Sequence, residues 1–370
     1  MGSFSFLQSM FFFAFVALPW VAVSAQPQPP ADIPVDSAAR TAVIEALLKE
    51  LNKGYVFPDI AKKMEADIRG RASRGEYDEL TSGMKFAEKL TADLRAISKD
   101  KHLSVRHSAR PIPVRAERTE PTAEERQQFE RQMRLNNYGF RKVENLPGNI
   151  GYVEFRGFLD PKLGAETVRS AMAFLRHSDA IIFDLRENGG GDPKMVAHIS
   201  SYLFGDEPVH LNDLYWREGD KTEEFWTDPK MAEFKMANTP VYVLTAKRTF
   251  SGAEEFSYNL KNLKRGTIVG ETTGGGAHPG DNARLTEHFS AFIPSGRAIS
   301  PITKTNWEGT GVEPDIKVPK EQALHVAQIE ALKHLQSKAT DDWKPHYSRR
   351  IAELEKQLDE IKAGVKTATK

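Results

Sequence analysis

Cysteine is absent from the 370 residues of this chain. Without thiols the chain can form no disulfide bond, no thiolate metal site and no cysteine nucleophile. Any covalent catalysis must therefore use serine, threonine or lysine.

An excess of charge is also lacking, because 51 Lys and Arg residues balance 51 Asp and Glu residues. Proteins that bind nucleic acid or anionic membranes normally carry a basic surplus. We therefore predict no nucleic-acid partner. Hydrophobic residues make up 40% of the chain and charged residues 28%, which is typical of a globular protein with a sizeable core.

The common metal and nucleotide motifs are missing too. HExxH does not occur, and His102 and His107 lack a spacing typical of metal ligands. Gly189–Gly191 and Gly274–Gly276 follow predicted strands, but neither run fits GxGxxG or GxxxxGK[ST]. We predict no metal and no cofactor. The two glycine runs are either tight turns or backbone that points N–H groups at a substrate oxygen.

No apolar run is long enough to span a bilayer comfortably. The apolar stretch over residues 11–23 is broken by Pro19, and Val23-Ser24-Ala25 fits the small-x-small cleavage rule. We predict that residues 1–25 are a signal peptide and that the mature protein is exported, to the periplasm or outside the cell, without staying in the membrane. Because no Lys or Arg precedes the stretch, an uncleaved membrane anchor is the alternative.

The rest of the chain divides into four parts. Apolar residues at helical spacing predict an N-terminal helical subdomain over residues 26–110. Residues 111–145 read as a charged connection with one surface helix from Ala123 to Leu135. Alternating strands and helices over residues 146–320 predict an α/β core with parallel strands, and residues 321–370 predict two C-terminal helices.

Two further predictions rest on short patterns. Pro294-Ser295-Gly296, between strands predicted at 289–293 and 297–299, is typical of a hairpin turn. An apolar stripe on the otherwise charged last helix either packs on its own domain or mediates formation of a homo-oligomer. The stripe consists of Ile351, Leu354, Leu358 and Ile361.

The candidate nucleophile is Ser251. An apolar run, Val241–Leu244, ends shortly before it, and a predicted helix begins beside it. A buried strand that turns into a helix at a serine is typical of a nucleophile, because the helix start offers free N–H groups and a positive dipole end to an oxyanion. Ser251-x-x-Glu254 is also a capping box, so the alternative is a serine that only caps the helix.

Four motifs, of which the Ser251 motif is one, occur in one order with plausible gaps. They are Asp184-Leu185-Arg186-x-Asn188-x-Gly190-Gly191, Thr249-x-Ser251-x-x-Glu254, Gly270-Glu271-x-Thr273 and Gly311-Val312-x-Pro314-Asp315. Together they resemble the tail-specific, or C-terminal-processing, serine peptidases, over about residues 40–320. The resemblance implies a core related to the ClpP and crotonase folds, with Ser251 as nucleophile.

Two differences from the bacterial tail-specific enzymes refine this resemblance. Those enzymes use a Ser–Lys dyad, and the segment that would supply the Lys, residues 273–277, has Gly276 instead. No strand-rich PDZ module is apparent between His102 and Ile150. The helical N-terminal part, which ends in Asp-x-His-Leu at residues 100–103, is similar to the tricorn protease core and to the repeats of interphotoreceptor retinoid-binding protein.

The resemblance to tricorn-type members implies partners for Ser251. The general base would be His102, which a reading without the family takes as a structural histidine at a strand end. The assisting acid would be Glu308, otherwise a solvated loop carboxylate. Tricorn has a Ser directly before its His, where this chain has Lys101, so the link between acid and base differs. His278 is the reserve base.

In such a site His102 would take the Ser251 proton and return it to the leaving group. The amide of Gly252, with that of Gly190 or Gly189, would form the oxyanion hole. We therefore predict an exported serine-type peptidase that forms an acyl-enzyme with a peptide or protein substrate. The alternative is a hydrophobic-ligand binder of the same fold, for a retinoid or fatty acid, although a pure binder has no need of this set of residues.

Overall fold

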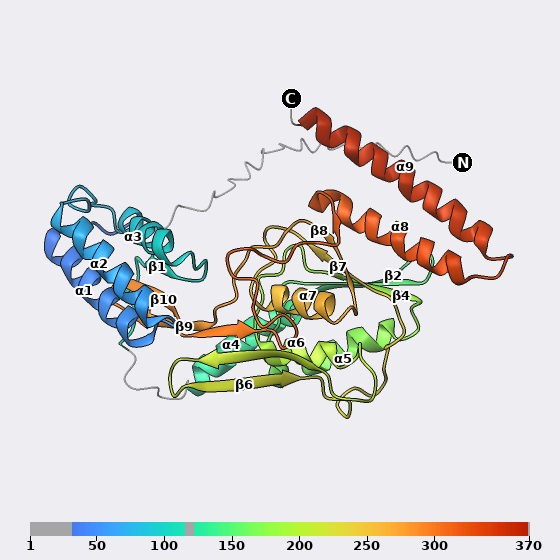
Figure 1. Cartoon of the computed structure of the whole chain (residues 1–370), viewed down its shortest axis with the longest axis horizontal. Helices are drawn as coiled ribbons and strands as arrows, with labels where there is room; N and C mark the ends of the chain where they lie inside the picture. The colour runs from blue at the N-terminus through green and yellow to red at the C-terminus, as the bar shows by residue number, and fades with distance from the viewer. Residues whose placement is uncertain (1–31, 115–121, 369–370) are drawn as a thin grey trace, which may run out of the picture. The chain divides into compact units, whose positions relative to one another are not determined.

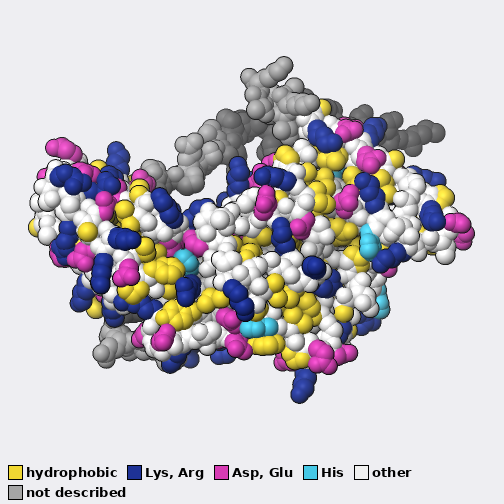
Figure 2. Space-filling model, in the orientation of Figure 1, with side chains coloured by type: hydrophobic (Ala, Val, Ile, Leu, Met, Phe, Trp, Pro, Cys, Tyr) yellow, Lys and Arg dark blue, Asp and Glu magenta, His cyan; other side chains and the backbone are white. Residues whose placement is uncertain are grey.

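The computed structural model describes residues 32–114 and 122–368. The predicted signal peptide, residues 1–25, lies outside the described residues. Within the described ranges no helix is both long and apolar enough to cross a membrane. Figure 2 shows Lys and Arg side chains interspersed with Asp and Glu side chains over the visible face, which matches the equal totals in the sequence.

Three helices and a strand build the N-terminal part. α1 begins after Asp36, whose carboxylate accepts the Ala39 amide at 2.7 Å. α3 begins after Ser82, whose hydroxyl accepts the Lys85 amide at 3.1 Å. Such caps satisfy amides that have no partner inside the helix. The elements are α1 (Ser37–Gly54), α2 (Pro58–Ser73), α3 (Gly83–Ser98) and β1 (Ser104–His107) (Figure 1).

A six-stranded sheet forms the centre of the α/β core, in the order β12-β8-β7-β4-β3-β2. All neighbouring strands are parallel except β2 and β3, which are antiparallel. This confirms the predicted α/β class. The strands are β2 (Phe140–Leu146), β3 (Ile150–Phe155), β4 (Ala180–Asp184), β7 (Val241–Thr245), β8 (Thr267–Gly270) and β12 (Ile316–Lys317).

Helices cover both faces of this sheet. In β4, Ile181 and Phe183 pack with α5, α6 and α7, whereas Ala180 and Ile182 pack with α8 and α9. Because alternate side chains of a strand point to opposite faces, a strand buried on both sides reads as a continuous apolar run. The helices are α5 (Pro161–Leu175), α6 (Pro193–Ser200), α7 (Gly252–Asn262), α8 (Lys320–Lys338) and α9 (Lys344–Ala368) (Figure 1).

The predicted surface helix is present as α4 (Ala123–Leu135), capped by a Thr122–Glu125 capping box. The apolar stripe of α9 packs on its own chain, because Ile351, Leu354 and Leu358 are buried in the cluster formed with α8 and the sheet. Three of its four residues therefore need no second copy to cover them, and homo-oligomer formation stays a prediction.

The hairpin predicted around Pro294–Gly296 is wrong. β10 (Phe289–Pro294) pairs with β1 and with β9 (Gly280–Arg284), whereas β11 (Gly296–Ile299) pairs with β5 (His210–Trp216) in another sheet. The amides of Ser295 and Gly296 both donate to the Pro279 carbonyl, so the turn passes the chain from one sheet to the next. The sequence patterns also missed β5, β9 and the strand beside β5, which is β6 (Lys221–Trp226). They missed β2 as well, because most of it falls in the predicted charged connection, whereas it pairs with β3 in the central sheet.

The pairing of β1 with β10 determines where the N-terminal part meets the core. Phe289 and Ile293 of β10 are buried in the same apolar cluster as α1, α2 and α3. The turn before β1, residues 99–103, consequently lies beside the segment before β9, where Asp100 and His278 form a hydrogen bond. The candidate site is built at this junction.

Candidate active site

Ser251 lies in a strained turn between β7 and α7. Its backbone has φ +53° and ψ −123°, a conformation that residues other than glycine rarely adopt and that costs about 1–3 kcal/mol. Neighbouring bonds hold it there, because the Phe250 amide donates to the Asn188 carbonyl at 3.1 Å and the Thr249 hydroxyl donates to the Leu185 carbonyl at 2.7 Å. Strain fixed in this way is typical of functional residues.

Glu254 joins this turn to the second glycine run. Its buried carboxylate accepts the amides of Ser251 and Gly276 at 2.9 Å each. It also accepts the Thr273 hydroxyl and the Gly275 amide at 2.5 Å each. Burial raises the pKa of Glu254 to about 7, although these donors act in the opposite direction. The carboxylate half of the predicted capping box is thus formed, and the same carboxylate positions the glycine run.

The first glycine run packs directly against the serine turn. Gly190 has φ +95°, and a Cβ atom there would lie 2.6 Å from the Gly252 nitrogen. Gly191 has φ +144°, and a Cβ atom there would collide with the Phe158 carbonyl. Only glycine allows this approach.

The amides near Ser251 differ in whether they are already engaged. The Gly190 amide donates to the Asn188 side chain at 2.9 Å, and the Gly189 amide donates to the Arg156 carbonyl at 3.2 Å. In the described part of the chain, the amides of Gly191 and Gly252 donate to no protein acceptor. Gly191 was not among the predicted oxyanion-hole residues, although it belongs to the glycine run that pointed to such a role.

His102 lies close to the serine turn without a hydrogen bond to it. Its ring packs on Phe250, which precedes Ser251, with ring centroids 4.6 Å apart, and stacks on Phe292 at 5.8 Å. Burial lowers the pKa of His102 to about 4, so the imidazole is neutral at pH 7. Its Nδ1 is buried and has no hydrogen-bond partner among the described residues.

The space that a dyad Lys would need is filled. A Cβ atom on Gly276 would lie 2.7 Å from Cε1 of His102 and would overlap the ring of Phe250. A longer side chain at this position would have to displace both rings. His102 therefore occupies the place that Gly276 leaves open.

The reserve base, His278, lies between two carboxylates. Its Nδ1 is 2.8 Å from Oδ2 of Asp100 and 3.5 Å from Oε2 of Glu308. The Tyr55 hydroxyl also donates to Asp100 at 3.2 Å. Asp100, His278 and Glu308 have the donor types of a metal site. Protein N–H and O–H groups already occupy these carboxylate oxygens, so the set fits a hydrogen-bonded cluster better.

Glu308 reaches the base only through the backbone. Its Oε1 accepts the Lys101 amide at 3.1 Å, and its Oε2 accepts the Ala277 amide at 2.5 Å. Burial, followed by the nearby Asp100, raises the pKa of Glu308. The Lys101 ammonium points elsewhere and donates to the Gly274 carbonyl at 2.5 Å. The structure thus brings Glu308 beside the residue before His102, with no hydrogen bond to the imidazole.

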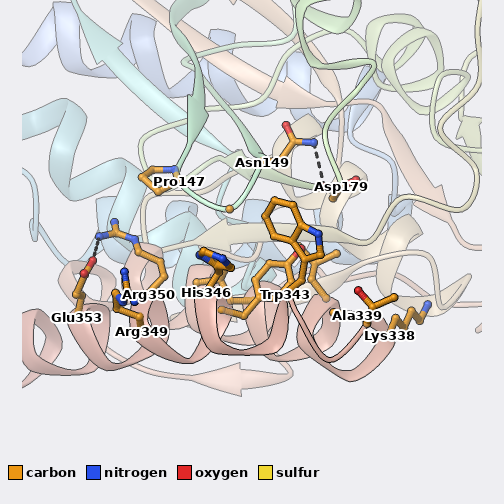
Figure 3. Close-up of a pocket in the computed structure, with 15 residues that line it drawn as sticks. Pro147, Asn149, Asp179, Lys338, Ala339, Trp343, His346, Arg349, Arg350 and Glu353 are labelled. Carbon is orange, nitrogen blue, oxygen red and sulfur yellow. Dashed lines mark hydrogen bonds and ion pairs between the residues drawn. The ribbon is translucent and has the colours of Figure 1, made fainter.

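A separate pocket of about 700 Å³ lies where α8 turns into α9 (Figure 3). Pro147 and Asn149 line one side, and Trp343 and Arg350 line the other. None of the predicted site residues lines this pocket.

Two family models and one curated protein match parts of this chain. Residues 149–318 match the model of Peptidase family S41, and residues 32–136 match the N-terminal domain of peptidase S41 in eukaryotic IRBP. The Arabidopsis thaliana protein Carboxyl-terminal-processing peptidase 2, chloroplastic, is 26% identical over 190 residues, which are 47% of this chain and 34% of that protein. The chain thus spans about a third of the length of this curated relative.

Two solved structures have a similar fold. A Parabacteroides merdae protein assigned as a peptidase is 19% identical, with a TM-score of 0.52 over 76% of this chain and 90% of that one. A lipoprotein from Streptococcus agalactiae is 14% identical, with a TM-score of 0.50 over 80% of this chain and 96% of that one. At these identities the similarity concerns the fold alone.

Proposed function

Because the chain belongs to Peptidase family S41, a family of serine-type peptidases, we propose that it is an exported serine peptidase that forms an acyl-enzyme on Ser251. The observation that carries this proposal is the surroundings of one strained serine. Two unengaged amides, of Gly191 and Gly252, lie beside it. The neutral ring of His102 packs against Phe250, the residue before it. Export rests on the sequence of residues 1–25.

The proposed reaction begins with proton transfer from the Ser251 hydroxyl to the His102 imidazole. The serine oxygen attacks the substrate carbonyl, and the amides of Gly252 and Gly191 hold the resulting oxyanion. The amides of Gly190 or Gly189 would first have to leave their present acceptors. His102 then donates its proton to the leaving amine, and water later releases the acyl group.

This scheme requires the His102 ring to come within hydrogen-bond distance of Ser251 when substrate is bound. Catalytic hydrogen bonds are often long or absent without substrate and form in the complex. Glu308 would act indirectly, by holding the Lys101 amide and with it the turn that carries His102. A peptide or protein is the proposed substrate.

Labelling with a fluorophosphonate probe tests the proposal. We expect the wild type to be labelled, Ser251→Ala to remain unlabelled, and His102→Ala to be labelled at least about 100-fold more slowly, because a positioned base contributes this much or more. Ser257→Ala is the matched control: Ser257 lies on the same helix, but its hydroxyl only donates to the Ala253 carbonyl. Equal labelling of all four proteins would refute the assignment.

The second candidate is a binder of a hydrophobic ligand, favoured by the match of residues 32–136 to the IRBP domain. Tight binding of retinol or a fatty acid that is unchanged in Ser251→Ala, together with no ester or peptide turnover, would support it over the peptidase.

A further inference from the structure

The turn that carries the candidate base is held by two buried carboxylates. Asp100 Oδ1 accepts the amides of His102 at 3.0 Å and Leu103 at 3.4 Å. Glu308 Oε1 accepts the amide of Lys101 at 3.1 Å. Three consecutive amides, at residues 101–103, are therefore fixed by one side chain of the same turn and one from a distant segment.

The position of His102 depends on this backbone support. Its ring packs on Phe250 and Phe292, but its Nδ1 has no hydrogen-bond partner among the described residues. In a Ser–His–Asp triad a carboxylate orients the imidazole directly. Here the carboxylates bind the amides of the turn instead, so the backbone has to do the orienting.

His278 forms a hydrogen bond with the other oxygen of Asp100 and lies close to the other oxygen of Glu308. Its Nδ1 lies 2.8 Å from Asp100 and 3.5 Å from Glu308, and its side chain is only 7% exposed. Asp100 is completely buried, and 13% of the Glu308 side chain is exposed. Two carboxylates this close repel each other and lose hydration, and a buried N–H donor beside them offsets part of that cost.

We propose that His278 is a positioning residue: through Asp100 and Glu308 it fixes the turn at residues 101–103 and so holds the His102 ring beside Ser251. This role rests on the proposed function for its effect on catalysis. The contacts themselves hold whether or not the chain is a peptidase. In this role His278 supports the turn, and His102 remains the residue that takes the Ser251 proton.

Two substitutions separate the donor from the bulk of the ring. His278→Asn places an N–H donor near the position of Nδ1, whereas His278→Leu keeps similar bulk and removes the donor. We expect kcat to fall about 100-fold in the Leu variant with KM within about twofold, because a misplacement of about 1 Å can cost this much. The Asn variant should recover at least about tenfold of that loss.

Amide hydrogen exchange over residues 99–105 provides a readout that needs no activity. His278→Leu removes the N–H donor, so amide exchange at residues 101–103 should become faster. His278→Asn keeps a donor, so exchange there should stay near the wild-type rate. His198→Leu is the matched control. His198 is a partly buried imidazole on α6 that has no ion pair with a carboxylate in the described chain. It should change neither readout.

The outcomes separate the possible roles of His278. Wild-type kcat and exchange in both variants would overturn the proposal. So would an Asn variant as inactive as His102→Ala with unchanged exchange, because His278 would then act as the base. If the wild type shows no peptidase activity, the proposed function is refuted. Faster exchange in His278→Leu than in that wild type would still support the positioning contacts. If His278→Leu does not fold, His278→Gln replaces it, since its donor lies near Nε2 instead.

Discussion

The serine side and the histidine side of this site are constructed in different ways. Ser251 lies in a short continuous stretch, in which β7, the turn and α7 follow one another within residues 241–262, and bonds to Leu185 and Asn188 fix the turn. His102 is held by Asp100, Glu308 and His278, which come from three separate segments. The nucleophile turn is therefore shaped mainly by contiguous sequence, whereas His102 is positioned through contacts between distant segments.

The two sides are also connected by different chemistry. On the serine side one carboxylate, Glu254, accepts four donors and ties Ser251 to Gly275 and Gly276. On the histidine side two carboxylates converge on His278, which forms a hydrogen bond with Asp100 and lies 3.5 Å from Glu308. A single substitution should consequently do most damage on the serine side, where one carboxylate accepts four hydrogen bonds.

The largest effect is expected for Glu254→Gln. The amide group of Gln presents donors to some of the four groups that now donate to the carboxylate, and each buried donor left unpaired costs about 1–3 kcal/mol. We expect about 3 kcal/mol of stability to be lost, measured by chemical unfolding. Hydrolysis should fall about 100-fold, because the Ser251 turn and the glycine run are no longer held together.

Glu255→Gln is the control for this substitution. Glu255 is the next residue on α7 and is equally buried, and burial raises its pKa to about 8, so it is largely protonated at pH 7. A neutral amide should replace it with little loss of activity. If both variants lose activity equally, the special role of Glu254 is wrong.

Much of the serine side was predictable, because its signals are contiguous. The run Val241–Leu244, the serine and the following helical pattern lie next to one another in the sequence and form β7 and α7 in the structure. The parallel sheet was predictable for a similar reason, since strands buried on both faces read as unbroken apolar runs.

The histidine side was not predictable from local patterns. Asp100 and His278 are 178 residues apart, and they meet only because β1 pairs with β10. The local pattern around Pro294 suggested that β10 pairs with β11, which would have hidden this junction. Strand partners are chosen by packing over the whole domain, and no short stretch of sequence records that choice. Only the family resemblance pointed to His102 and Glu308.

A smaller effect, of opposite sign on the two sides, is expected in the pH dependence of stability. Burial lowers the pKa of His102 from 6.5 to about 4, so the unfolded chain binds the extra proton first and His102 destabilises the fold as pH falls from about 6.5 to 4. Burial raises the pKa of Glu254 from 4.5 to about 7, so Glu254 destabilises the fold as pH rises from about 4.5 to 7.

Unfolding measured between pH 4 and 7 tests this pair of signs. His102→Phe should remove the loss of stability on the acid side, and Glu254→Gln should remove the loss on the neutral side. If either variant keeps the pH slope of the wild type, its group does not titrate in the way that its burial implies.

The smallest effect is expected for Lys101→Met, which tests whether side chain or backbone links the acid to the base. Lys101 directly precedes the candidate base, but Glu308 accepts its backbone amide, and the ammonium donates to the Gly274 carbonyl. Methionine keeps the amide and most of the bulk, so kcat should change by less than about threefold, since an exposed polar contact contributes little. A loss comparable to that of His278→Leu would mean that the ammonium itself holds the glycine run in place. The histidine side would then depend on one side chain, as the serine side depends on Glu254, and the contrast between the two sides would disappear.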